Sequence, residues 1–382
     1  MHAPYEIMFE RIKHMLIKEF IQVFRDPRMR MVIFVIPCLQ VFVIGYAISM
    51  DVKHVRTALF DLDNSQSSRE LAASFARSGY FDVVERIGTD EEATALLDRG
   101  KVSAVLHIMH GFADDLQAGR TAQLQVLVDG ADSNTASIVI SYASKIAAAY
   151  SEKILVERYR RRLGAIELPG RPVLETRAWF NENLESRNFF VPGVLVIVVS
   201  VVTLLLTSMA VVREREIGTM EQIMVTPITP LEFILGKTVP FVVIGFIDVA
   251  LVTLIGVFWF EVPIRGNPAL LFFATGLYLM TMLGIGLFIS TVSHTQQQAM
   301  ISTFFFFFPA MLLSGFAFPI ANMPEPVQWL TLFDPLRYFL VIVRAIFLKG
   351  VGMDILWPQM LALGVMGVSM LWLASKRFHK TL

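Results

Sequence analysis

The chain has 382 residues, of which 55% are hydrophobic and only 17% are charged, a composition that excludes an ordinary soluble domain. The 33 basic and 33 acidic residues cancel, so the net charge gives no reason to expect nucleic acid as a partner. Cys38 is the only cysteine, and the seven histidines lack zinc-ligand spacing. We therefore expect no catalytic residues, no metal site and no cofactor bound by this chain.

The N-terminal segment, residues 1–30, has apolar residues at helical spacing with basic residues between them. This pattern predicts an amphipathic helix that lies either in the cytoplasmic membrane interface or against protein. A cleaved signal peptide is disfavoured, because about 30 residues precede the first apolar run, more than a signal peptide carries. The apolar positions are Phe9, Ile12, Leu16, Phe20 and Val23.

Six apolar runs are long enough to cross a bilayer, which requires about 20 helical residues. Each run must be helical, because hydrocarbon offers the backbone no other hydrogen-bond partner. The sequence therefore predicts an α-helical integral membrane protein with six transmembrane helices. The runs are residues 31–49, 190–212, 238–260, 269–291, 299–318 and 354–375.

Lysine and arginine in the short flanks set the orientation of the spans. Basic residues precede the first run, lie between the second and third, and follow the last in the tail 376–382. The turn 261–268 on the other side carries only Arg265. We expect both termini and the loop 213–237 to be cytoplasmic.

Residues 50–189, between the first two spans, alternate predicted strands and helices outside the cytoplasm. Glycines separate the elements, and Asp90 is expected to cap a helix. The alternation predicts a small α/β domain. The basic run 157–162 is either a solvated helix face or a contact for lipid head groups or a partner. Strands are predicted at 56–61, 81–87, 102–108 and 124–130, and helices at 68–77, 90–100, 111–119 and 134–163.

The apolar run 335–348 competes as a seventh span. It is short and contains Arg337 and Arg344, and a seventh span would place the basic tail outside. Prolines and Trp329 nearby are typical of turns and anchoring at the interface. We predict that residues 319–353 form an external re-entrant or interfacial segment.

The triplet Gly236, Lys237 and Thr238 matches the end of a phosphate-binding loop. The complete pattern requires a glycine where this chain has Leu231, and a preceding strand, which the sequence TPITP cannot form. We expect no nucleotide site here.

The cytoplasmic loop 213–237 begins with alternating charges and then places Ile217, Met220, Ile223 and Met224 on one helical face. Prolines end the pattern. The loop is either a short amphipathic helix that transmits a push between two spans or a plain interfacial connection.

The run 186–237 resembles the permease subunits of ABC-2 type exporters, and so do residues 290–299, 312–324 and 344–350. Residues 128–136 are similar to the large external loop of the multidrug-export branch. The resemblance implies the ABC-2 exporter arrangement of six transmembrane helices in the bacterial cell (inner) membrane. It also implies that ATP is bound by separate ABC ATP-binding subunits, and that the permease pairs with a second permease, identical or paralogous.

The same resemblance identifies the cytoplasmic element after the second span as the one that docks in the ATPase. Residues 6–25 correspond to the connecting helix of the family, and residues 319–350 to its short external re-entrant helices. By resemblance, the coupling residues are Glu214, Arg215, Glu216, Gly218, Thr219, Met220, Glu221 and Gln222.

Within the spans, Asp248 is a charged residue far from either end. An unpaired carboxylate there is costly, so it is either protonated or hydrogen-bonded inside the bundle, or it faces a polar cavity and meets a cationic substrate or a proton. Phe304, Phe305 and Phe308, before Pro309, are candidates to line a hydrophobic pathway or to contact lipid.

Two other classes of function compete with an ATP-driven exporter of hydrophobic or amphiphilic compounds, drugs among them. One is an ion-gradient-driven secondary transporter that uses Asp248, although the two halves of the chain do not match. The other is a membrane-anchored receptor or scaffold. The cargo stays open, and the size of the external domain suggests a periplasmic membrane-fusion adaptor as a further partner.

Overall fold

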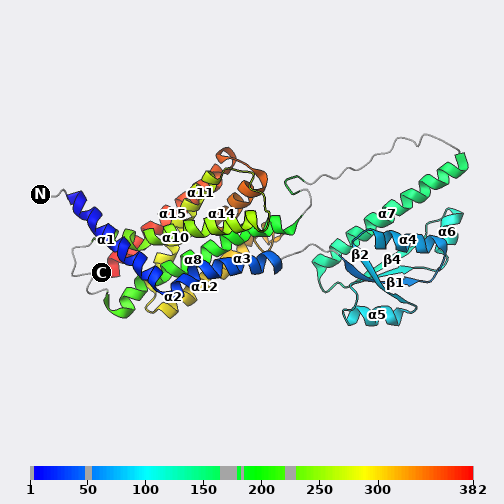
Figure 1. Ribbon diagram of the computed structural model, residues 1–382, viewed down its shortest axis with the longest axis horizontal. Helices are drawn as coiled ribbons and strands as arrows, with labels where there is room; N and C mark the ends of the chain where they lie inside the picture. The colour runs from blue at the N-terminus through cyan, green and yellow to red at the C-terminus, as the bar shows by residue number, and fades with distance from the viewer. Residues whose placement is uncertain (1–3, 48–53, 164–178, 182–184, 220–228, 382) are drawn as a thin grey trace. The chain divides into compact units, whose positions relative to one another are not determined.

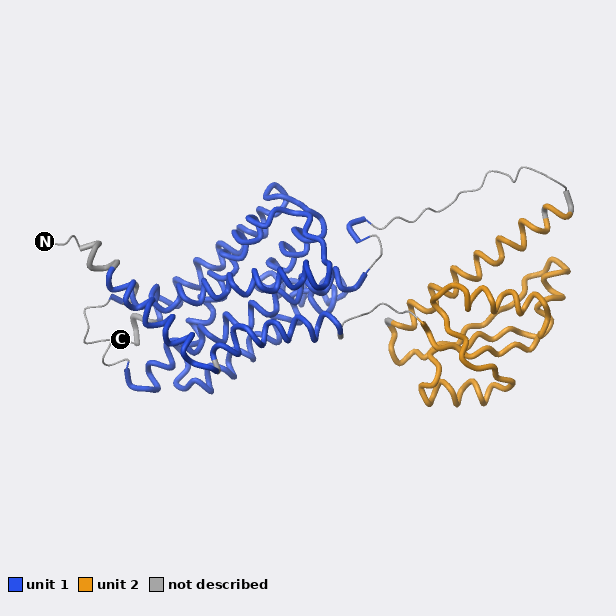
Figure 2. The backbone as a smooth tube through the Cα atoms, in the orientation of Figure 1, with its two compact units in different colours: residues 1–49, 177–382 blue, residues 50–176 orange. Residues whose placement is uncertain are grey.

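The computed structural model describes residues 4–47, 54–163, 179–181, 185–219 and 229–381. The chain divides into two compact units (Figures 1 and 2). Residues 1–49 and 177–382 form a helical unit, and residues 50–176 form the second unit.

Helix α8, Ser186–Ile217, is the centre of the helical unit. Its apolar window is 83% buried inside the protein, because α3, α10, α11, α12 and α14 all pack on it (Figure 1). Its valine-rich sequence is helical although valine is a poor intrinsic helix former. Tertiary packing on all sides therefore decides its conformation.

Four of the described helices are long and apolar enough to cross a membrane. They are α8, α10 (Pro230–Phe258), α11 (Pro268–Val292) and α15 (Met353–Thr381). The other two predicted spans are shorter or more polar. The first is an apolar helix over Met31–Tyr46, built from η1 (Met31–Val35) and α3 (Ile36–Ala47), and the second is α12 (Gln296–Leu313), which begins with three glutamines. The six-span arrangement stays a prediction.

Helix α10 begins at Pro230, well before the predicted start of the third span at residue 238. Thr229 accepts a hydrogen bond from the backbone N–H of Glu232, whose carboxylate accepts one from the N–H of Thr229. Proline at the first helical position lacks only an N–H that the helix would leave unused. Pro230, which was expected to end structure in this loop, therefore begins a helix, and Pro227 lies outside the described residues.

The N-terminal helix α1, Pro4–Arg25, packs against α10. Met15, Glu19 and Val23 are its buried residues, and of the predicted apolar stripe Val23 is buried while Ile12, Leu16 and Phe20 are partly buried. Ile17, Ile21 and Phe24 remain exposed. This helix therefore packs on protein, which was one of the two predicted alternatives. Its exposed apolar side chains lie on a different face from the one that packs on α10. A four-residue helix, α2 (Pro27–Arg30), leads to η1.

The segment predicted to be re-entrant or interfacial consists of short elements, none with the length of a span. Its longest helix, α14 (Pro335–Arg344), buries Leu336, Phe339 and Val343 against the unit and packs on α8 and α15. The others are η2 (Ile320–Asn322), α13 (Glu325–Leu330), η3 (Thr331–Phe333) and η4 (Ala345–Lys349).

The second unit contains a four-stranded sheet in the order β2-β1-β3-β4. Strands β1 (Val55–Asp61), β2 (Phe81–Ile87) and β3 (Ala104–Ile108) are parallel, and β4 (Leu124–Val128) is antiparallel to β3. The strands and helices predicted from the alternating sequence pattern are all present in this unit, and its location outside the cytoplasm stays a prediction.

Helices cover both faces of this sheet. Leu71 and Phe75 of α4 (Gln66–Arg77) and Val139 of α7 (Ser133–Leu163) share one hydrophobic cluster with the sheet. Helix α5 (Asp90–Asp98) contributes Ala93 and Leu96 to the cluster on the other face. Helix α6 (Phe112–Ala118) lies near α4.

The predicted cap of α5 was wrong by one residue. Thr89 has extended backbone angles, and its hydroxyl accepts from the N–H of Glu92. Asp90 is instead the first residue of the helix, where its negative charge favours the helix N-terminus.

Helix α11 packs closely on both α15 and α8 through glycines. A Cβ on Gly284 would lie 2.8 Å from Cβ of Met370, and a Cβ on Gly286 would lie 2.8 Å from Cβ of Thr207. Gly276 has no such contact, since its Cβ would lie 3.6 Å from Phe246. Close helix packing through glycine therefore occurs at Gly284 and Gly286 and not at Gly276.

We expect Gly284→Ala to destabilise the protein by about 1–3 kcal/mol, because the new methyl group meets the backbone of α15. Thermal unfolding of the purified protein in detergent measures the change. Gly276→Ala on the same helix is the matched control and should leave the unfolding temperature unchanged or raise it. Equal unfolding temperatures for the two variants would contradict the close contact between α11 and α15.

Candidate functional site

A buried ion-pair cluster joins the C-terminal end of α8 to α1 and α10. Nζ of Lys237 lies 2.6 Å from Oε1 of Glu214 and 2.7 Å from Oε1 of Glu19. All three side chains are at most 5% exposed. Lys237 comes from the second turn of α10, Glu214 from the last turn of α8, and Glu19 from α1. The cluster joins α1 to α8 and α10, although α1 is distant from both in the sequence.

Two further groups complete this cluster. Nζ of Lys18 lies 3.2 Å from Oε1 of Glu214 and 3.6 Å from Oε1 of Glu19. The hydroxyl of Thr219 donates to Oε2 of Glu214. Two lysines therefore balance two glutamates, which is the condition under which charges can be buried without a large desolvation cost.

More exposed pairs surround the cluster. Arg11 of α1 lies 3.8 Å from Glu232 of α10, and Arg213 of α8 lies 3.9 Å from Asp26, just after α1. These ion pairs help to orient the helices, but they add little to the stability of the fold, because partly exposed ion pairs contribute little free energy. They repeat the same connections that the buried cluster makes.

The end of α8 is also attached to the junction between α11 and α12. The carboxylate of Glu216 accepts hydrogen bonds from the backbone N–H of Gln296, at 3.2 Å, and from its Nε2, at 2.7 Å. Arg215 donates to the carbonyl of Ser293 at 3.2 Å. The last turn of α8 thus contacts α1, α10 and the α11–α12 connection at once.

The predicted coupling residues divide into two groups. Glu214, Arg215 and Glu216 lie in the last turns of α8, where we expected a loop, and Gly218 ends the helix in a left-handed conformation with φ of 83°. Thr219 follows and folds back on Glu214. Met220, Glu221 and Gln222 lie outside the described residues, together with most of the predicted amphipathic helix.

Sequence reasoning missed Lys18, Glu19 and Lys237 as members of this site. The available signal was Glu19, which lies four residues from Met15 and from Val23 on the face of α1 that is buried. A carboxylate on a buried helix face requires a cation from another element.

The Gly236–Lys237–Thr238 triplet lies inside helix α10, so its backbone is not a phosphate-binding loop. A Cβ on Gly236 would lie 2.5 Å from Sδ of Met15, so this glycine allows α1 to approach α10. The lysine is engaged by the two carboxylates. The triplet serves helix packing.

Asp248 lies in the middle of α10 and is completely buried. Neither carboxylate oxygen has a hydrogen-bond partner within the described part of the chain. This burial agrees with the first predicted alternative, in which the carboxylate lies inside the bundle and is protonated or hydrogen-bonded.

The predicted phenylalanines lie on α12, away from Asp248. Phe305 and Phe308 are 83% and 52% exposed, and Phe304 is half-buried and stacks on Phe308. Pro309 is exposed within the same helix. Helix α12 packs mainly on α8, and α10 packs on α1, α8 and α11, so the two helices that carry the predicted pathway residues share α8 as a neighbour.

Comparison with known proteins gives consistent matches along the chain. Residues 27–376 match the family described as "ABC-2 family transporter protein". The chain is 33% identical to the probable multidrug ABC transporter permease YbhR of Escherichia coli strain K12, over 92% of this chain and 94% of that protein. It is 32% identical to the probable multidrug ABC transporter permease YbhS of the same strain, over 97% of this chain and 98% of that protein. The linearmycin resistance permease protein LnrN of Bacillus subtilis is 22% identical over 83% of this chain and 86% of its own length.

We expect Lys237→Met to destabilise the protein by about 3–5 kcal/mol, because it leaves Glu19 and Glu214 buried without a cation between them. Thermal unfolding in detergent measures the loss. Lys13→Met removes an exposed lysine from α1 and should change little.

A triple variant separates charge from packing in this cluster. Adding Glu19→Gln and Glu214→Gln to Lys237→Met removes the unpaired charges and should restore most of the lost stability. If the triple variant is as unstable as Lys237→Met alone, ion pairing is not what the cluster contributes.

Proposed function

Because the chain belongs to the ABC-2 family of transporter proteins, we propose that it is the membrane-spanning permease subunit of an ATP-driven exporter. The exporter moves hydrophobic or amphiphilic compounds, drugs among them, out across the bacterial inner membrane. Hydrolysis takes place on a separate ABC ATP-binding subunit. The observation that carries the proposal is the buried cluster that joins α1, α8 and α10 and includes Glu214, the first of the proposed coupling residues.

The geometry of that cluster supports a mechanical role. A force on the segment after Gly218 reaches α8 through the chain, α1 and α10 through the carboxylate of Glu214, and α12 through Glu216. Each connection is a charged or hydrogen-bonded contact of defined geometry, which transmits displacement better than a sliding apolar contact. The proposed ATPase contacts are α1 and residues 214–222.

The proposed topology has six spans with both termini in the cytoplasm. Met31–Tyr46 supplies the first span and α12 the fifth, and the α/β unit lies outside the cytoplasm between the first and second. The proposed partners are the ATP-binding subunits and a second permease, identical or paralogous. The names of the relatives YbhR, YbhS and LnrN as permeases support this assembly. A periplasmic adaptor is a further proposed partner of the external unit.

Asp248, Phe304, Phe305, Phe308 and Pro309 remain our proposal for the substrate pathway. Complete burial of Asp248, with no hydrogen-bond partner among the described residues, favours a protonated side chain in this conformation, because an ionised carboxylate there is strongly disfavoured. A conformational change during transport that separates α10 from its neighbouring helices would expose the carboxylate of Asp248. The ion-gradient alternative uses the same carboxylate as a proton site.

To test coupling, the permease is reconstituted in liposomes with its cognate ATP-binding subunit. We expect Met220→Ala combined with Glu221→Ala to lower transport at least about tenfold while hydrolysis continues, because the docking contact that links the two processes is lost. Gln297→Ala, an exposed polar residue at the start of α12, is the control. Unchanged transport by the double variant would refute the coupling assignment.

To test the pathway, Asp248→Asn is compared with the unchanged protein. We expect transport of a cationic dye to fall while transport of a neutral compound continues, since the amide cannot neutralise a cation. Thermal stability should not fall, because the amide removes a buried ionisable group.

The same preparation separates the two energy sources. We expect transport to stop on ATP depletion and to survive collapse of the proton gradient. Transport that persists without ATP and stops with the proton gradient would favour the secondary transporter.

A further inference from the structure

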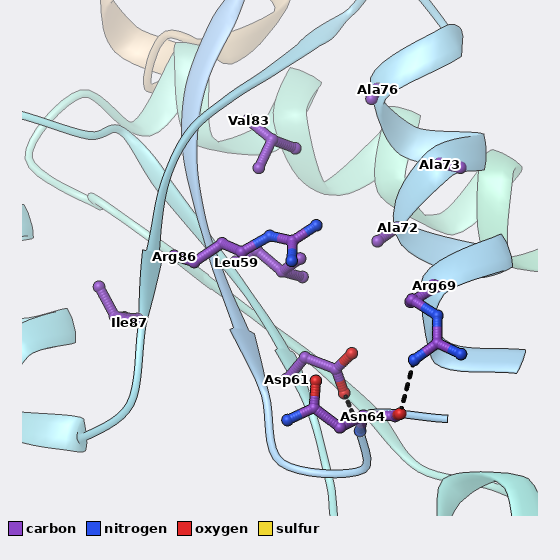
Figure 3. Close-up of a pocket in the computed structure, with 10 residues that line it drawn as sticks. All are labelled: Leu59, Asp61, Asn64, Arg69, Ala72, Ala73, Ala76, Val83, Arg86 and Ile87. Atoms are coloured by element: carbon purple, nitrogen blue, oxygen red, sulfur yellow. Dashed lines mark hydrogen bonds between the residues drawn. The ribbon is translucent and has the colours of Figure 1, made fainter. Parts of the chain in front are cut away.

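A cavity of about 320 Å³ lies between helix α4 and strands β1 and β2 of the α/β unit (Figure 3). This volume is at the lower end of the range of small-molecule sites, roughly 300–1,000 Å³. Leu59 forms part of the wall on the sheet side, and Ala72, Ala73 and Ala76 form the wall on the helix side. The row of alanines leaves space that longer side chains would fill.

A β-bulge places Arg86, whose side chain is partly open to solvent, at this cavity. Strand β2 contains one extra residue, Val84, relative to its neighbour β1. In a regular strand Arg86 would lie on the face opposite to Val83, because alternate side chains share a face. The bulge reverses the alternation, so Arg86 pairs with Leu59 and lines the same cavity as Val83. Figure 3 shows its guanidinium in the space in front of α4.

The cavity carries a net positive charge. The Arg86 side chain forms no ion pair or hydrogen bond with any part of the chain that the structure describes. Arg69 donates one N–H to the carbonyl of Asn64 at 2.8 Å, which leaves the rest of its guanidinium for a ligand (Figure 3). Two guanidinium groups therefore face one carboxylate, that of Asp61.

The Asp61 carboxylate is already used within the protein. It accepts hydrogen bonds from the backbone N–H groups of Asp63, at 3.1 Å, and Asn64, at 3.0 Å, and from the hydroxyl of Ser68, at 2.7 Å. It holds the loop between β1 and α4 in place. Among the residues that the structure describes, no carboxylate forms an ion pair with Arg69 or Arg86.

We propose that this cavity is a binding site for an amphiphilic anion, a carboxylate on a short apolar body. Arg86 and Arg69 pair with the carboxylate through charge-assisted hydrogen bonds, and the apolar body packs on Leu59 and the alanines of α4. A cationic compound is excluded by the same two arginines. The proposal depends on the α/β unit alone and holds whether or not the chain works as an exporter.

The test uses the full-length protein in lipid nanodiscs and a photoreactive benzoate that carries a trifluoromethyl-diazirine. After illumination, labelled peptides are mapped by mass spectrometry. We expect saturable labelling of the peptides that carry residues 66–77 and 81–87. Arg86→Gln should lower this labelling about tenfold or more, as expected for loss of a charge-assisted hydrogen bond.

Two further variants separate the effect of the arginine charge from the effect of the cavity volume. Ala73→Leu keeps Arg86 but fills the cavity, and it should also abolish the labelling. Arg99→Gln removes an exposed arginine beyond the end of α5, outside the cavity, and should label like the unchanged protein. Circular dichroism and thermal unfolding verify that each variant keeps its fold.

Three results would overturn the proposal. One is undiminished labelling of Arg86→Gln, and another is equal labelling of the same peptides by the neutral benzyl alcohol analogue. The third is labelling confined to the membrane helices, which would show that the probe only partitions into lipid.

Discussion

The helical unit depends on one ammonium group shared by two carboxylates. Lys237 of α10 lies between Glu19 of α1 and Glu214 of α8, and none of the three reaches solvent appreciably. A charge left alone in such a place costs several kcal/mol, so each helix fixes the position of the other two. Helix α1 cannot leave without removing one of the two carboxylates that pair with Lys237, and α8 cannot turn at its end without breaking both its buried contact and the hydrogen bonds of Glu216 to Gln296.

This constraint gives the proposed exporter a physical basis for its coupling. Helix α1 and the segment after Gly218 are the two places where we propose that the ATPase docks. Both lead to the same carboxylates within one or two helical turns. A displacement imposed at either place therefore reaches α10, which carries Asp248 at its middle.

Hydropathy predicted the cores of the long helices and the alternation of the α/β unit, because burial and periodicity act over many residues. Hydropathy misplaced the ends of these helices. Pro230 begins a helix through the Thr229–Glu232 capping box, and the charges at 214–216 belong to a helix because buried and cross-helix partners satisfy them. Those partners are distant in sequence, as are Glu19 and Lys237, so a pattern read along the chain cannot pair them. The bulge at Val84 is likewise fixed by pairing with β1 and not by local sequence.

The glycine contacts of α11 have a consequence for motion. Backbones that meet at Gly284 and Gly286 leave no side-chain layer that can slide or repack, so α8, α11 and α15 form a rigid block. We therefore expect any rearrangement during transport to leave this block intact and to involve the helices packed around it, such as α3 and α12. In that case the centre of the molecule is a fixed frame for its peripheral helices.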